Sequence, residues 1–415
     1  MGRRALAVMA WLTLAACTAE PQPPKPTRQG SEAPFRNVVI IVIDTLRADI
    51  LKQAHTPRLD ALASTGQQVE RAWSSGTWTA PSVISLFTGT PVRSHGWDLP
   101  AGHIGKYPPL PDRPTIAEVL AAHGYHTTAL VTNPYLTTDL GFDRGFARYR
   151  RTSDEAMLKA LKAELTSERD VERPQFFYLH LLGPHSPLRP SAAARERLGL
   201  DEGWFKGPRG LLIGAAKRNQ ASGVRAAYAA AYRGVVEDTD ERVGALVDTL
   251  TSALDDTLFV VTSDHGELLG EHGIVGHGPH LWEPLTAVPL IVGGVANLPR
   301  QMSIDAIPDL ITDLLSIEAT WPSQVGASDQ LVSQREGATT ISDTSLVKWI
   351  WNSDGGYRFD LQTDPDEQHP SSIGGAGETA LRAWHKVTPK AEDLPLIVSL
   401  PEATQRELKA LGYTD

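Results

Sequence analysis

The sequence predicts an α/β fold with a mostly parallel central sheet flanked by helices, followed by a small C-terminal α+β subdomain. Apolar runs typical of buried strands alternate with segments of helical periodicity, as in parallel sheets covered on both faces. The first strand, Asn37–Ile43, reads NVVIIVI, a β-branched run of the kind that is buried on both faces. After about residue 340 two short strands flank the Asp354-Gly355-Gly356 segment, which is a hairpin signal.

Each element follows from a local signal in the sequence. A Thr-Pro pair places an N-cap and a first-turn proline at the start of a helix over 56–63. A second helix is expected to begin at Thr79 and to end near Gly89. The same signals predict further helices over 115–122, 154–165, 224–250 and 403–411, and strands over 126–132, 176–182, 258–262, 288–292, 346–351 and 357–361.

The composition excludes several classes of protein. The chain has 415 residues, of which 41% are hydrophobic, and this fraction is ordinary for a folded protein. Its formal net charge of −10 disfavours a nucleic-acid-binding role, which usually needs a basic surface. The single cysteine, Cys17, excludes both an intramolecular disulfide and a cysteine-rich zinc site.

The N-terminus is typical of an exported protein. Arg3 and Arg4 precede an apolar run over 5–16, which is too short to span a bilayer and is read as a signal peptide over 1–16. The run ends in Leu-Ala-Ala-Cys, which resembles a bacterial lipobox with Cys17 as the lipidated residue. The alternative is an ordinary signal peptide with a chance cysteine. Residues 17–36 form a Pro-rich tether after the lipidated cysteine.

The expected location follows from this reading of the N-terminus. We expect a lipid-anchored protein of the cell envelope, because no later apolar run is long enough to span a bilayer. Thr18 follows the cysteine, and by resemblance to lipoprotein sorting signals this favours the outer membrane, facing the periplasm or the exterior. The expected partner is therefore a membrane, through the N-terminal lipid.

Acidic residues follow two of the predicted strands. Asp44 ends the first strand, and Asp264-His265 follows the strand over 258–262. In open α/β sheets, ligands bind beyond the carboxyl ends of the strands. Two carboxylates and an imidazole suit Zn²⁺ or Mn²⁺, and suit Ca²⁺ or Mg²⁺ less well because of the nitrogen ligand. The simpler interpretation is that each Asp is a turn residue or a helix cap.

The predicted helix that begins at Thr79 and a glycine-rich histidine loop supply further candidates. A hydroxyl at a helix N-terminus lies beside free N–H groups, where tetrahedral oxyanions bind, although Thr79 can also be a plain N-cap. His265, His272, His277 and His280 fall between residues 265 and 280 among several glycines, and His185 lies in a Gly-Pro-His-Ser-Pro segment after a strand. For the loop histidines, surface solubility is the alternative.

These segments together resemble the sulfatase family within the alkaline phosphatase superfamily. The matching motifs are NVVIIVIDTLRAD, HTPRLDALASTG, TAPSVISLFTG, GPHSP, SDHGELLGEHGIVGHG and YRFDLQTDPDEQ, which run in order from residue 37 toward the C-terminus. The resemblance implies an alkaline-phosphatase-like catalytic domain over 37–335 and a C-terminal subdomain over 336–415, with an antiparallel hairpin and a closing helix.

The resemblance assigns roles to individual residues. Asp44, Asp264 and His265 fall on metal-ligand positions, and Thr79 falls on the nucleophile, which also contacts the metal. His185 and His277 fall on substrate-contacting positions and are candidates for proton transfer. In addition, His272 of the histidine loop is a candidate for substrate binding.

Three residues depart from the pattern of the family. Sulfatases oxidise a Cys or Ser to formylglycine, whereas Thr79 is a secondary alcohol that cannot yield this aldehyde. Val83 replaces the signature Arg, and Thr45 replaces the second Asp of the usual pair. A Thr nucleophile is instead similar to the lipoteichoic-acid-synthase, phosphoethanolamine-transferase and phosphodiesterase branches, which form a covalent phosphothreonine.

The sequence therefore predicts a metal-dependent hydrolase of sulfate or phosphate esters. One divalent ion is expected, with Mn or Zn favoured over Ca or Mg, and it would lower the pKa of the Thr79 hydroxyl for in-line attack. The expected substrate is a small molecule or an envelope glycan or lipid ester, and no nucleic-acid partner is expected. Two alternatives remain: a transferase that moves phospho-groups within the envelope, and a non-catalytic binding protein on the same fold.

Overall fold

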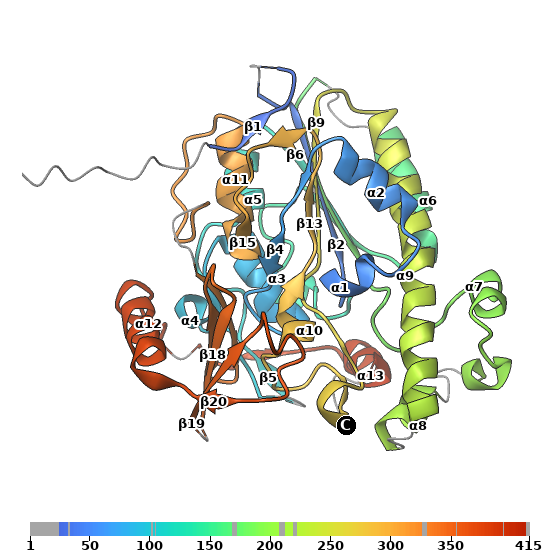
Figure 1. The fold of residues 1–415 in the computed structure, drawn as a ribbon. Coiled ribbons are helices and arrows are strands. Elements are labelled where there is room, and N and C mark those ends of the chain that lie inside the picture. Colours follow the sequence, from blue (N-terminus) through green and yellow to red (C-terminus); the bar gives the residue numbers. More distant parts are fainter. Residues whose placement is uncertain are drawn as a thin grey trace, which may run out of the picture.

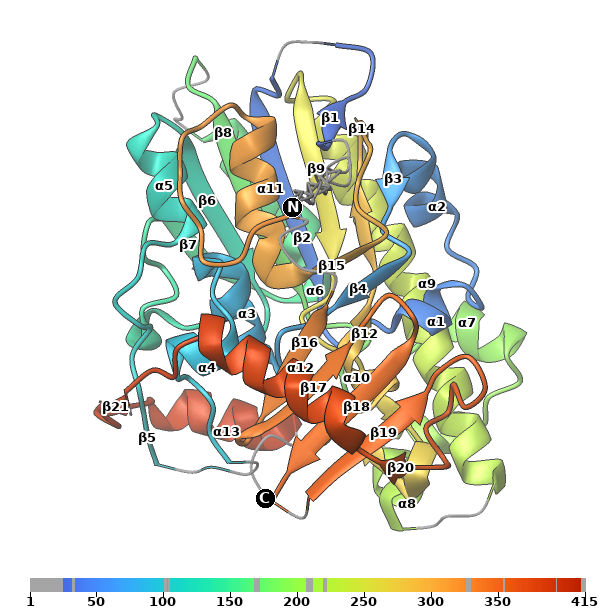
Figure 2. The same cartoon turned by 60° about the vertical axis from the view of Figure 1, so that its left-hand side comes forward.

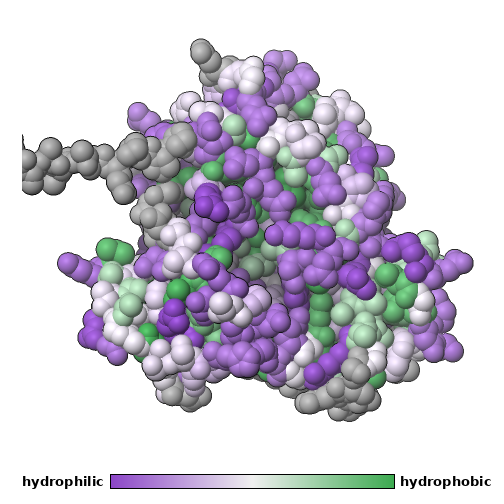
Figure 3. Space-filling view, in the orientation of Figure 1, coloured by the Kyte–Doolittle hydropathy of each residue, from purple (hydrophilic) through white to green (hydrophobic). Residues whose placement is uncertain are grey.

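The computed structural model describes residues 25–31, 34–100, 103, 105–167, 172–206, 212–218, 222–325, 330–353, 355–392 and 394–411. The signal peptide predicted over 1–16 and Cys17 lie outside the described residues. None of the described helices combines the length and the apolar character needed to cross a bilayer. The face of the molecule in Figure 3 is largely hydrophilic, with small apolar patches between polar side chains.

A seven-stranded mixed sheet forms the centre of the molecule (Figure 1). Five adjacent strands of this sheet run parallel to one another. The strand Leu290–Val292 is antiparallel to both of its neighbours. In spatial order the strands are β3 (Gln67–Gln68), β13 (Leu290–Val292), β9 (Thr257–Thr262), β2 (Asn37–Ile43), β8 (Gln175–Leu181), β6 (His126–Val131) and β7 (Arg148–Arg151). The predicted mostly parallel sheet is therefore confirmed.

Helices cover both faces of this sheet. Alternate residues of β2 point to opposite sides, so Val38 and Ile40 join one apolar core while Val39 and Ile41 join the other. The first face is covered by α3 (Thr79–Thr88), α5 (Ile116–Ala122) and α11 (Ile307–Leu314). The second face is covered by α1 (Ala48–Leu51), α2 (Pro57–Ser64), α6 (Asp154–Thr166) and α9 (Ser222–Thr251).

A five-stranded antiparallel sheet forms most of the C-terminal subdomain (Figure 2). Its strands are β16 (Leu331–Arg335), β17 (Ala338–Ser342), β18 (Val347–Asn352), β19 (Gly355–Asp360) and β20 (Ser371–Ser372). Helix α12 (Gly374–Val387) crosses this sheet so closely that a Cβ on Gly377 would lie 2.4 Å from Trp349 Cδ1. The boundary expected between residues 335 and 336 falls inside the β16–β17 hairpin, because the antiparallel sheet already begins at β16.

The remaining described strands form four small sheets, and the remaining described helices are short. The small sheets are β12 (Ala287–Val288) with β4 (Arg71–Trp73) and β15 (Gln301–Ser303), β1 (Thr27–Arg28) with β14 (Val295–Ala296), β10 (Leu268–Leu269) with β11 (Val275–Gly276), and β5 (Lys106–Tyr107) with β21 (Val398–Ser399). The other helices are α4 (Val92–His95), α7 (Ala192–Arg197), α8 (Leu212–Arg218), α10 (Glu283–Thr286) and α13 (Glu402–Leu411).

Two local expectations were wrong in detail. The strand expected over 288–292 is split at Pro289, whose missing N–H cannot continue a ladder, so β12 and β13 belong to different sheets. Thr56 is at the N-cap of α2 as expected, but its side chain makes no capping hydrogen bond. The Asp240 carboxylate of α9 instead accepts from the backbone N–H groups of Arg58 and Leu59, at 3.0 and 2.8 Å.

A buried ion cluster joins the C-terminal sheet to the larger α/β part of the chain. Lys348 of β18 is fully buried, and its Nζ lies 2.8 Å from Glu367 Oε1 and 3.6 Å from Glu283 Oε1. The same ammonium lies 4.9 Å from the ring centroid of Trp73 in β4. Glu283 begins α10, which follows the histidine loop, so this cluster fixes the loop's far end to the sheet.

The N-terminal strand β1 lies at the opposite end of the central sheet from the carboxyl ends of the parallel strands. Arg28 forms an ion pair with Asp256, which directly precedes β9, and the backbone N–H of Arg36 also donates to Asp256. Part of the segment expected to be a tether, 17–36, is therefore paired with the domain.

Candidate active site

Polar side chains from four neighbouring strands meet at one edge of the central sheet. Asp44 follows β2, Asp264 and His265 follow β9, Asn133 follows β6, and His180 lies near the end of β8. All five side chains are buried. Because β9, β2, β8 and β6 are adjacent and parallel, their carboxyl ends place these residues side by side, as the sequence predicts for Asp44, Asp264 and His265.

Three buried atoms converge here without a hydrogen-bond partner among the described residues: Asp44 Oδ1, Asp264 Oδ2 and His265 Nε2. His265 Nε2 lies 3.7 Å from each of the two carboxylate oxygens. His265 Nδ1 contacts the carbonyl oxygen of Gly266 at 2.8 Å, and a carbonyl only accepts, so the neutral ring carries its proton on Nδ1. Its Nε2 lone pair therefore faces the carboxylates, which is the tautomer that a metal ligand needs.

The pKa values of the two carboxylates shift in opposite directions. Burial raises the pKa of Asp264 well above its ordinary value, and the nearby charge of Asp44 raises it further. Burial also raises the pKa of Asp44, but the imidazoles of His185, His180 and His265 outweigh it and hold this pKa below its ordinary value. Two carboxylates in one buried site cannot both ionise cheaply unless a cation lies between them. The donor set thus fits a divalent cation.

His180 also belongs to this group, and the sequence analysis missed it. Asp44, Asp264 and His180 each offer one ligand atom, and these atoms lie within 4.8 Å of one another. His180 Nε2 is 3.5 Å from Asp44 Oδ2, and its Nδ1 is 3.0 Å from the hydroxyl of Tyr178. A histidine inside an apolar strand looks like a core residue in the sequence. The available signal was its place near the carboxyl end of a central strand.

Thr79 is the first residue of α3 and is fully buried beside Asp44. Its Oγ1 lies 3.5 Å from Asp44 Oδ2 and accepts a hydrogen bond from Asn133 Nδ2 at 3.1 Å. The N-cap position of α3 is Trp78, and no side chain caps this helix. Plain N-capping by Thr79, the simpler reading of this position, is therefore wrong. The hydroxyl faces the carboxylate group from the positive end of a helix.

The entry to α3 is fixed by a compact hydroxyl network. Ser74 Oγ donates to the carbonyl oxygen of Asp264 and contacts Ser82 Oγ at 3.0 Å. Ser82 Oγ also donates to the carbonyl oxygen of Gly76 at 3.0 Å. These bonds connect the first turn of α3 to the loop that carries Asp264. At the other end of α3, Gly89 has a φ of 60°, and a Cβ there would lie 2.8 Å from Trp321.

Thr45 lies where the resemblance places a second Asp. Its φ is 62°, an uncommon backbone conformation for a threonine. This conformation lets the Thr45 N–H donate to Asp264 Oδ1 at 3.2 Å, while its carbonyl oxygen accepts from the Tyr232 hydroxyl at 2.6 Å. The backbone of Thr45 therefore orients Asp264, whereas its uncharged side chain adds no negative charge to the site.

Two further predicted histidines stand over this group. His277 Nδ1 lies 2.8 Å from Glu267 Oε2, and the His277 ring is 4.6 Å from the His265 ring and 5.0 Å from the His185 ring, centre to centre. Burial lowers the pKa of His277 to about 4 and that of His265 to about 3, and it also lowers the pKa of His185. His185 and His277 thus lie beside the group that contains Asp44, Asp264 and His265, as predicted.

A cavity of about 310 Å³ opens above these histidines. Its lining includes His185, His277 and two cationic side chains, Arg335 of β16 and Lys217 of α8. The Arg335 guanidinium carbon lies 4.8 Å from the ring centroid of Trp78, the residue before Thr79. The cavity therefore offers two cationic side chains to an anionic group, while the Glu267 carboxylate lines the same space and Arg335 is also paired with Asp98 and Glu336.

His272 and His280 lie elsewhere in the loop. Each of their rings stacks on the Trp282 indole, at centroid distances of 3.7 Å for His272 and 4.3 Å for His280. Neither is among the described residues that line the cavity above His277. The structure therefore does not bring the predicted substrate contact of His272 to the site. The glycine-rich spacing of the loop could not show which of its histidines turn inward.

The chain matches known proteins along most of its length. A family described as Sulfatase matches residues 36–343. A choline-sulfatase of Rhizobium meliloti (strain 1021) is 26% identical and covers 80% of this chain and 81% of its own length. A sulfotransferase of low-salt glycan biosynthesis from Haloferax volcanii is 28% identical, covering 79% of this chain and 75% of its own. The crystal structure of a phosphonate monoester hydrolase of Agrobacterium radiobacter matches with a TM-score of 0.64 at 19% identity, over 85% of this chain and 94% of that one.

Proposed function

The chain belongs to the sulfatase family of ester hydrolases, and on this basis we propose that it hydrolyses sulfate or phosphonate monoesters with a divalent metal ion and a Thr79 nucleophile. The observation that carries the proposal is one arrangement of atoms. Thr79 Oγ1 lies 3.5 Å from Asp44 Oδ2. The other oxygen, Asp44 Oδ1, converges with Asp264 Oδ2 and His265 Nε2, and these three buried atoms have no hydrogen-bond partner among the described residues.

Asp44, Asp264 and His265 would hold the metal ion, and His180 is the candidate for a further ligand or for orienting Asp44. When bound, such an ion supplies positive charge that polarises the ester oxygens and favours the ionised Thr79 hydroxyl. The preference for Zn²⁺ or Mn²⁺ rests on the imidazole nitrogen in the donor set.

In the first half-reaction, Thr79 Oγ1 would attack sulfur or phosphorus in line with the ester oxygen. A bond from Oγ1 to the central atom forms, and the bond to the leaving alcohol breaks. The Nδ2 group of Asn133 would donate to Oγ1 as negative charge develops there. Thr79 loses one proton and the leaving alcohol gains one. A single imidazole can therefore accept the proton from Thr79 and donate it to the alcohol.

His277 and His185 are the candidates for this proton transfer. Glu267 holds the His277 ring through Nδ1 at 2.8 Å, and His277 lines the cavity that would take the substrate. In the second half-reaction, water would attack the central atom, pass a proton to the same imidazole, and release sulfate or phosphonate together with free Thr79. Because burial favours the neutral imidazole, this ring can serve as a base at neutral pH.

The class of substrate follows from the cavity and from the relatives. Arg335 and Lys217 would attract the anionic group, while the cavity of about 310 Å³ has room for only a modest leaving group. A choline-sulfatase and a sulfotransferase of low-salt glycan biosynthesis are among the relatives, so a sulfated small molecule or sulfated glycan is the proposed substrate. The envelope transferase is not favoured.

A substrate panel tests this proposal. Aryl sulfate, aryl phosphate, aryl phosphodiester and phenyl phosphonate monoester would be offered to the purified chain with Mn²⁺, Zn²⁺ or neither. Metal-dependent turnover of a monoester supports the proposal, and mass spectrometry of a quenched reaction should find the transferred group on Thr79. If no monoester is turned over with any metal, the chain is a binding protein on this fold and the proposal is overturned.

We also propose that Cys17 carries the lipid that holds the enzyme to the cell envelope. The support is the lipobox-like Leu-Ala-Ala-Cys sequence alone. In membrane fractions of expressing cells, the parent chain should sediment with membranes and incorporate labelled fatty acid. Cys17→Ala should lose both properties, and retention of the label in this variant would refute the assignment.

A further inference from the structure

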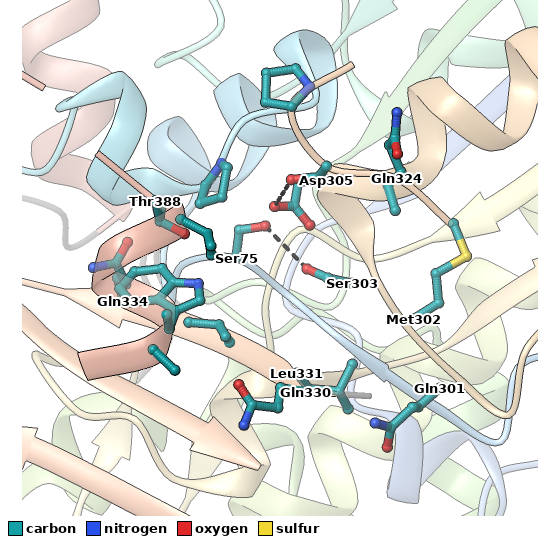
Figure 4. Close-up of a pocket in the computed structure, with 18 residues that line it drawn as sticks. Ser75, Gln301, Met302, Ser303, Asp305, Gln324, Gln330, Leu331, Gln334 and Thr388 are labelled. Carbon is teal, nitrogen blue, oxygen red and sulfur yellow. Dashed lines mark hydrogen bonds between the residues drawn. The ribbon is translucent and has the colours of Figure 1, made fainter. Parts of the chain in front are cut away.

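A second cavity, of about 520 Å³, lies where the C-terminal subdomain meets the catalytic part (Figure 4). It is separate from the active-site cavity. Gln334 lines this second cavity, whereas the next residue of β16, Arg335, lines the first. The two spaces therefore meet different residues at the end of β16.

The lining of the second cavity is mixed and carries no positive charge. The described residues that line it include no Lys, Arg or His. Apolar side chains alternate with side-chain amides and hydroxyls, and one acid and one indole accompany them. The polar members include Gln301, Ser303, Asp305, Gln324 and Gln334, and the indole is that of Trp384. A sulfate or phosphate group would find no cation here, in contrast to the active-site cavity with Arg335 and Lys217.

Asp305 gives the cavity a fixed hydrogen-bond acceptor (Figure 4). It is 5% exposed, and its Oδ2 accepts from Ser323 Oγ at 2.8 Å. Hydroxyls of Ser303 and Ser75 also stabilise its charge, while burial raises its pKa above the ordinary value. No ion pair of Asp305 is found among the described residues. A carboxylate surrounded by hydroxyl donors is suited to accept from further hydroxyl groups of a ligand.

Trp384 provides an aromatic wall. It lies on α12, is 9% exposed, and lines the cavity together with Val387 and Thr388 from the same helix end. An indole face next to amide and carboxylate groups presents an apolar surface and several directed polar contacts in one space. This combination matches a molecule that has C–H faces and hydroxyl edges.

We propose that this cavity is a binding site for a neutral saccharide unit. Its volume falls in the range of small-ligand sites, about 300–1,000 Å³. A saccharide would stack a ring face on Trp384 and would direct hydroxyl groups to Asp305 and to the amides of Gln301 and Gln324. The site is distinct from the proposed ester-cleaving site, and it makes no use of Thr79 or of the metal group.

The site also spans two parts of the chain. Asp305 and Gln324 come from the segment around α11, whereas Trp384 and Gln334 come from the C-terminal subdomain. A bound saccharide would therefore hold the two parts together. On a sulfated glycan, such a site would bind an unsulfated unit away from the scissile ester.

Isothermal titration calorimetry of the full chain tests the proposal. The probes are glucose, galactose, mannose, N-acetylglucosamine, lactose and cellobiose, with choline chloride as the cationic probe and sodium sulfate as the anionic probe. At least one saccharide should bind with a Kd of about 1 mM or tighter, the usual range for a few hydrogen bonds and one stacked ring. Saturable binding of choline or sulfate alone would overturn the proposal, as would no binding of any saccharide.

Variants connect the binding to the cavity. Asp305→Asn and Gln324→Ala should each weaken the saccharide by about tenfold, as expected when a ligand hydrogen bond is lost. Trp384→Phe should keep much of the affinity because it keeps a ring, and Trp384→Ala should abolish binding. The control is Gln53→Ala, which removes an exposed amide outside this cavity. Unchanged affinity in both Asp305→Asn and Gln324→Ala would place the binding elsewhere.

The outcome is independent of the proposed catalysis. Thr79→Ala should bind the saccharide with the parent's Kd, and the saccharide should not inhibit turnover of a small aryl ester competitively. Competitive inhibition would locate the saccharide in the active-site cavity and refute the second site. A parent chain that binds the saccharide but turns over no ester would refute the proposed function only.

Discussion

The side-chain amide of Asn133 donates a hydrogen bond to Thr79 Oγ1, at 3.1 Å, and its other N–H donates to Asp44 Oδ2 at 2.6 Å. The backbone N–H of Tyr135 donates to Asn133 Oδ1 at 2.9 Å, which fixes which end of the amide faces the site. One side chain thus positions the Thr79 hydroxyl relative to the Asp44 carboxylate.

Removal of this amide should slow the chemical step. Asn133→Leu keeps the approximate volume but removes both donors, so the negative charge that develops on Thr79 Oγ1 loses a fixed hydrogen bond. We expect kcat to fall by about 10²–10³, the scale for losing one preorganised donor. Steady-state kinetics on an aryl ester measures this, with metal content determined in parallel. A threefold change in kcat corresponds to about 0.7 kcal/mol in the activation free energy. A variant whose kcat lies within threefold of the parent value would show that Asn133 is a packing residue.

Thr79 itself should be indispensable for turnover. Thr79→Ala removes the attacking oxygen, and we expect kcat to fall by at least about 10³-fold. The matched control is Thr88→Ala, which removes a hydroxyl from the last turn of the same helix, where it donates to the Ile84 carbonyl. This control should retain near-parental kcat. Comparable activity in Thr79→Ala and Thr88→Ala would exclude Thr79 as the nucleophile.

Metal binding should depend on Asp264. Asp264→Asn replaces one of the two converging carboxylates by a neutral amide, so we expect metal affinity to fall by at least about 100-fold. Elemental analysis after dialysis against a defined Zn²⁺ or Mn²⁺ concentration measures the bound ion. Asp309→Asn is the control, because Asp309 lies on α11, away from the group, and its carboxylate accepts from the Val325 N–H. Equal metal content in both variants would contradict the ligand assignment.

The buried Lys348 should be more important for stability than an exposed lysine. Lys348→Met leaves Glu367 and Glu283 buried without their shared cation, and loss of one partner from a buried pair costs about 3–5 kcal/mol. Urea unfolding of the parent and variant measures the difference in free energy of unfolding. The double variant Lys348→Met with Glu367→Gln should recover part of the loss. A single variant as stable as the parent would mean that the ion cluster is not stabilising.

Asp305 should give a pH-dependent difference in stability. Burial raises its pKa in the folded state, so the folded chain binds this proton more tightly than the unfolded chain does. The parent should therefore lose stability relative to Asp305→Asn as the pH rises from the unfolded-chain pKa of about 4 to neutrality. Unfolding free energies of the two chains at pH 4.5 and 7.5 test this. A pH-independent difference would show that the two states bind the proton equally.

Only part of the site can be predicted from the sequence. Asp44 and Asp264 stand out because each follows an apolar strand, and the parallel topology brings them together. Asn133 is hidden because an Asn after a strand is an ordinary turn residue, and only its neighbours in space give it a partner. His272 and His277 are equivalent in a glycine-rich loop until the Trp282 stack and the Glu267 contact separate them.

The fold follows the same division. The central strands and the long helix α9 have strong periodic patterns, and their predicted positions agree closely with the structure. Strands β16 and β17 read LVSQR and ATTIS, in which polar residues are buried, so they lack the apolar alternation that marks a strand. Gln334 of β16 also pairs with the backbone of Ser75 and Gly76, a long-range contact that the sequence pattern does not encode.

The ion pair between Arg28 and Asp256 has a directional consequence. It fixes strand β1 beside the amino end of β9, whereas Asp264 lies past the carboxyl end of the same strand. The two points are therefore opposite poles of the sheet. A surface that held the N-terminus would leave the catalytic cavity pointing outward, so that substrates would reach it from the surrounding medium rather than from the surface beneath.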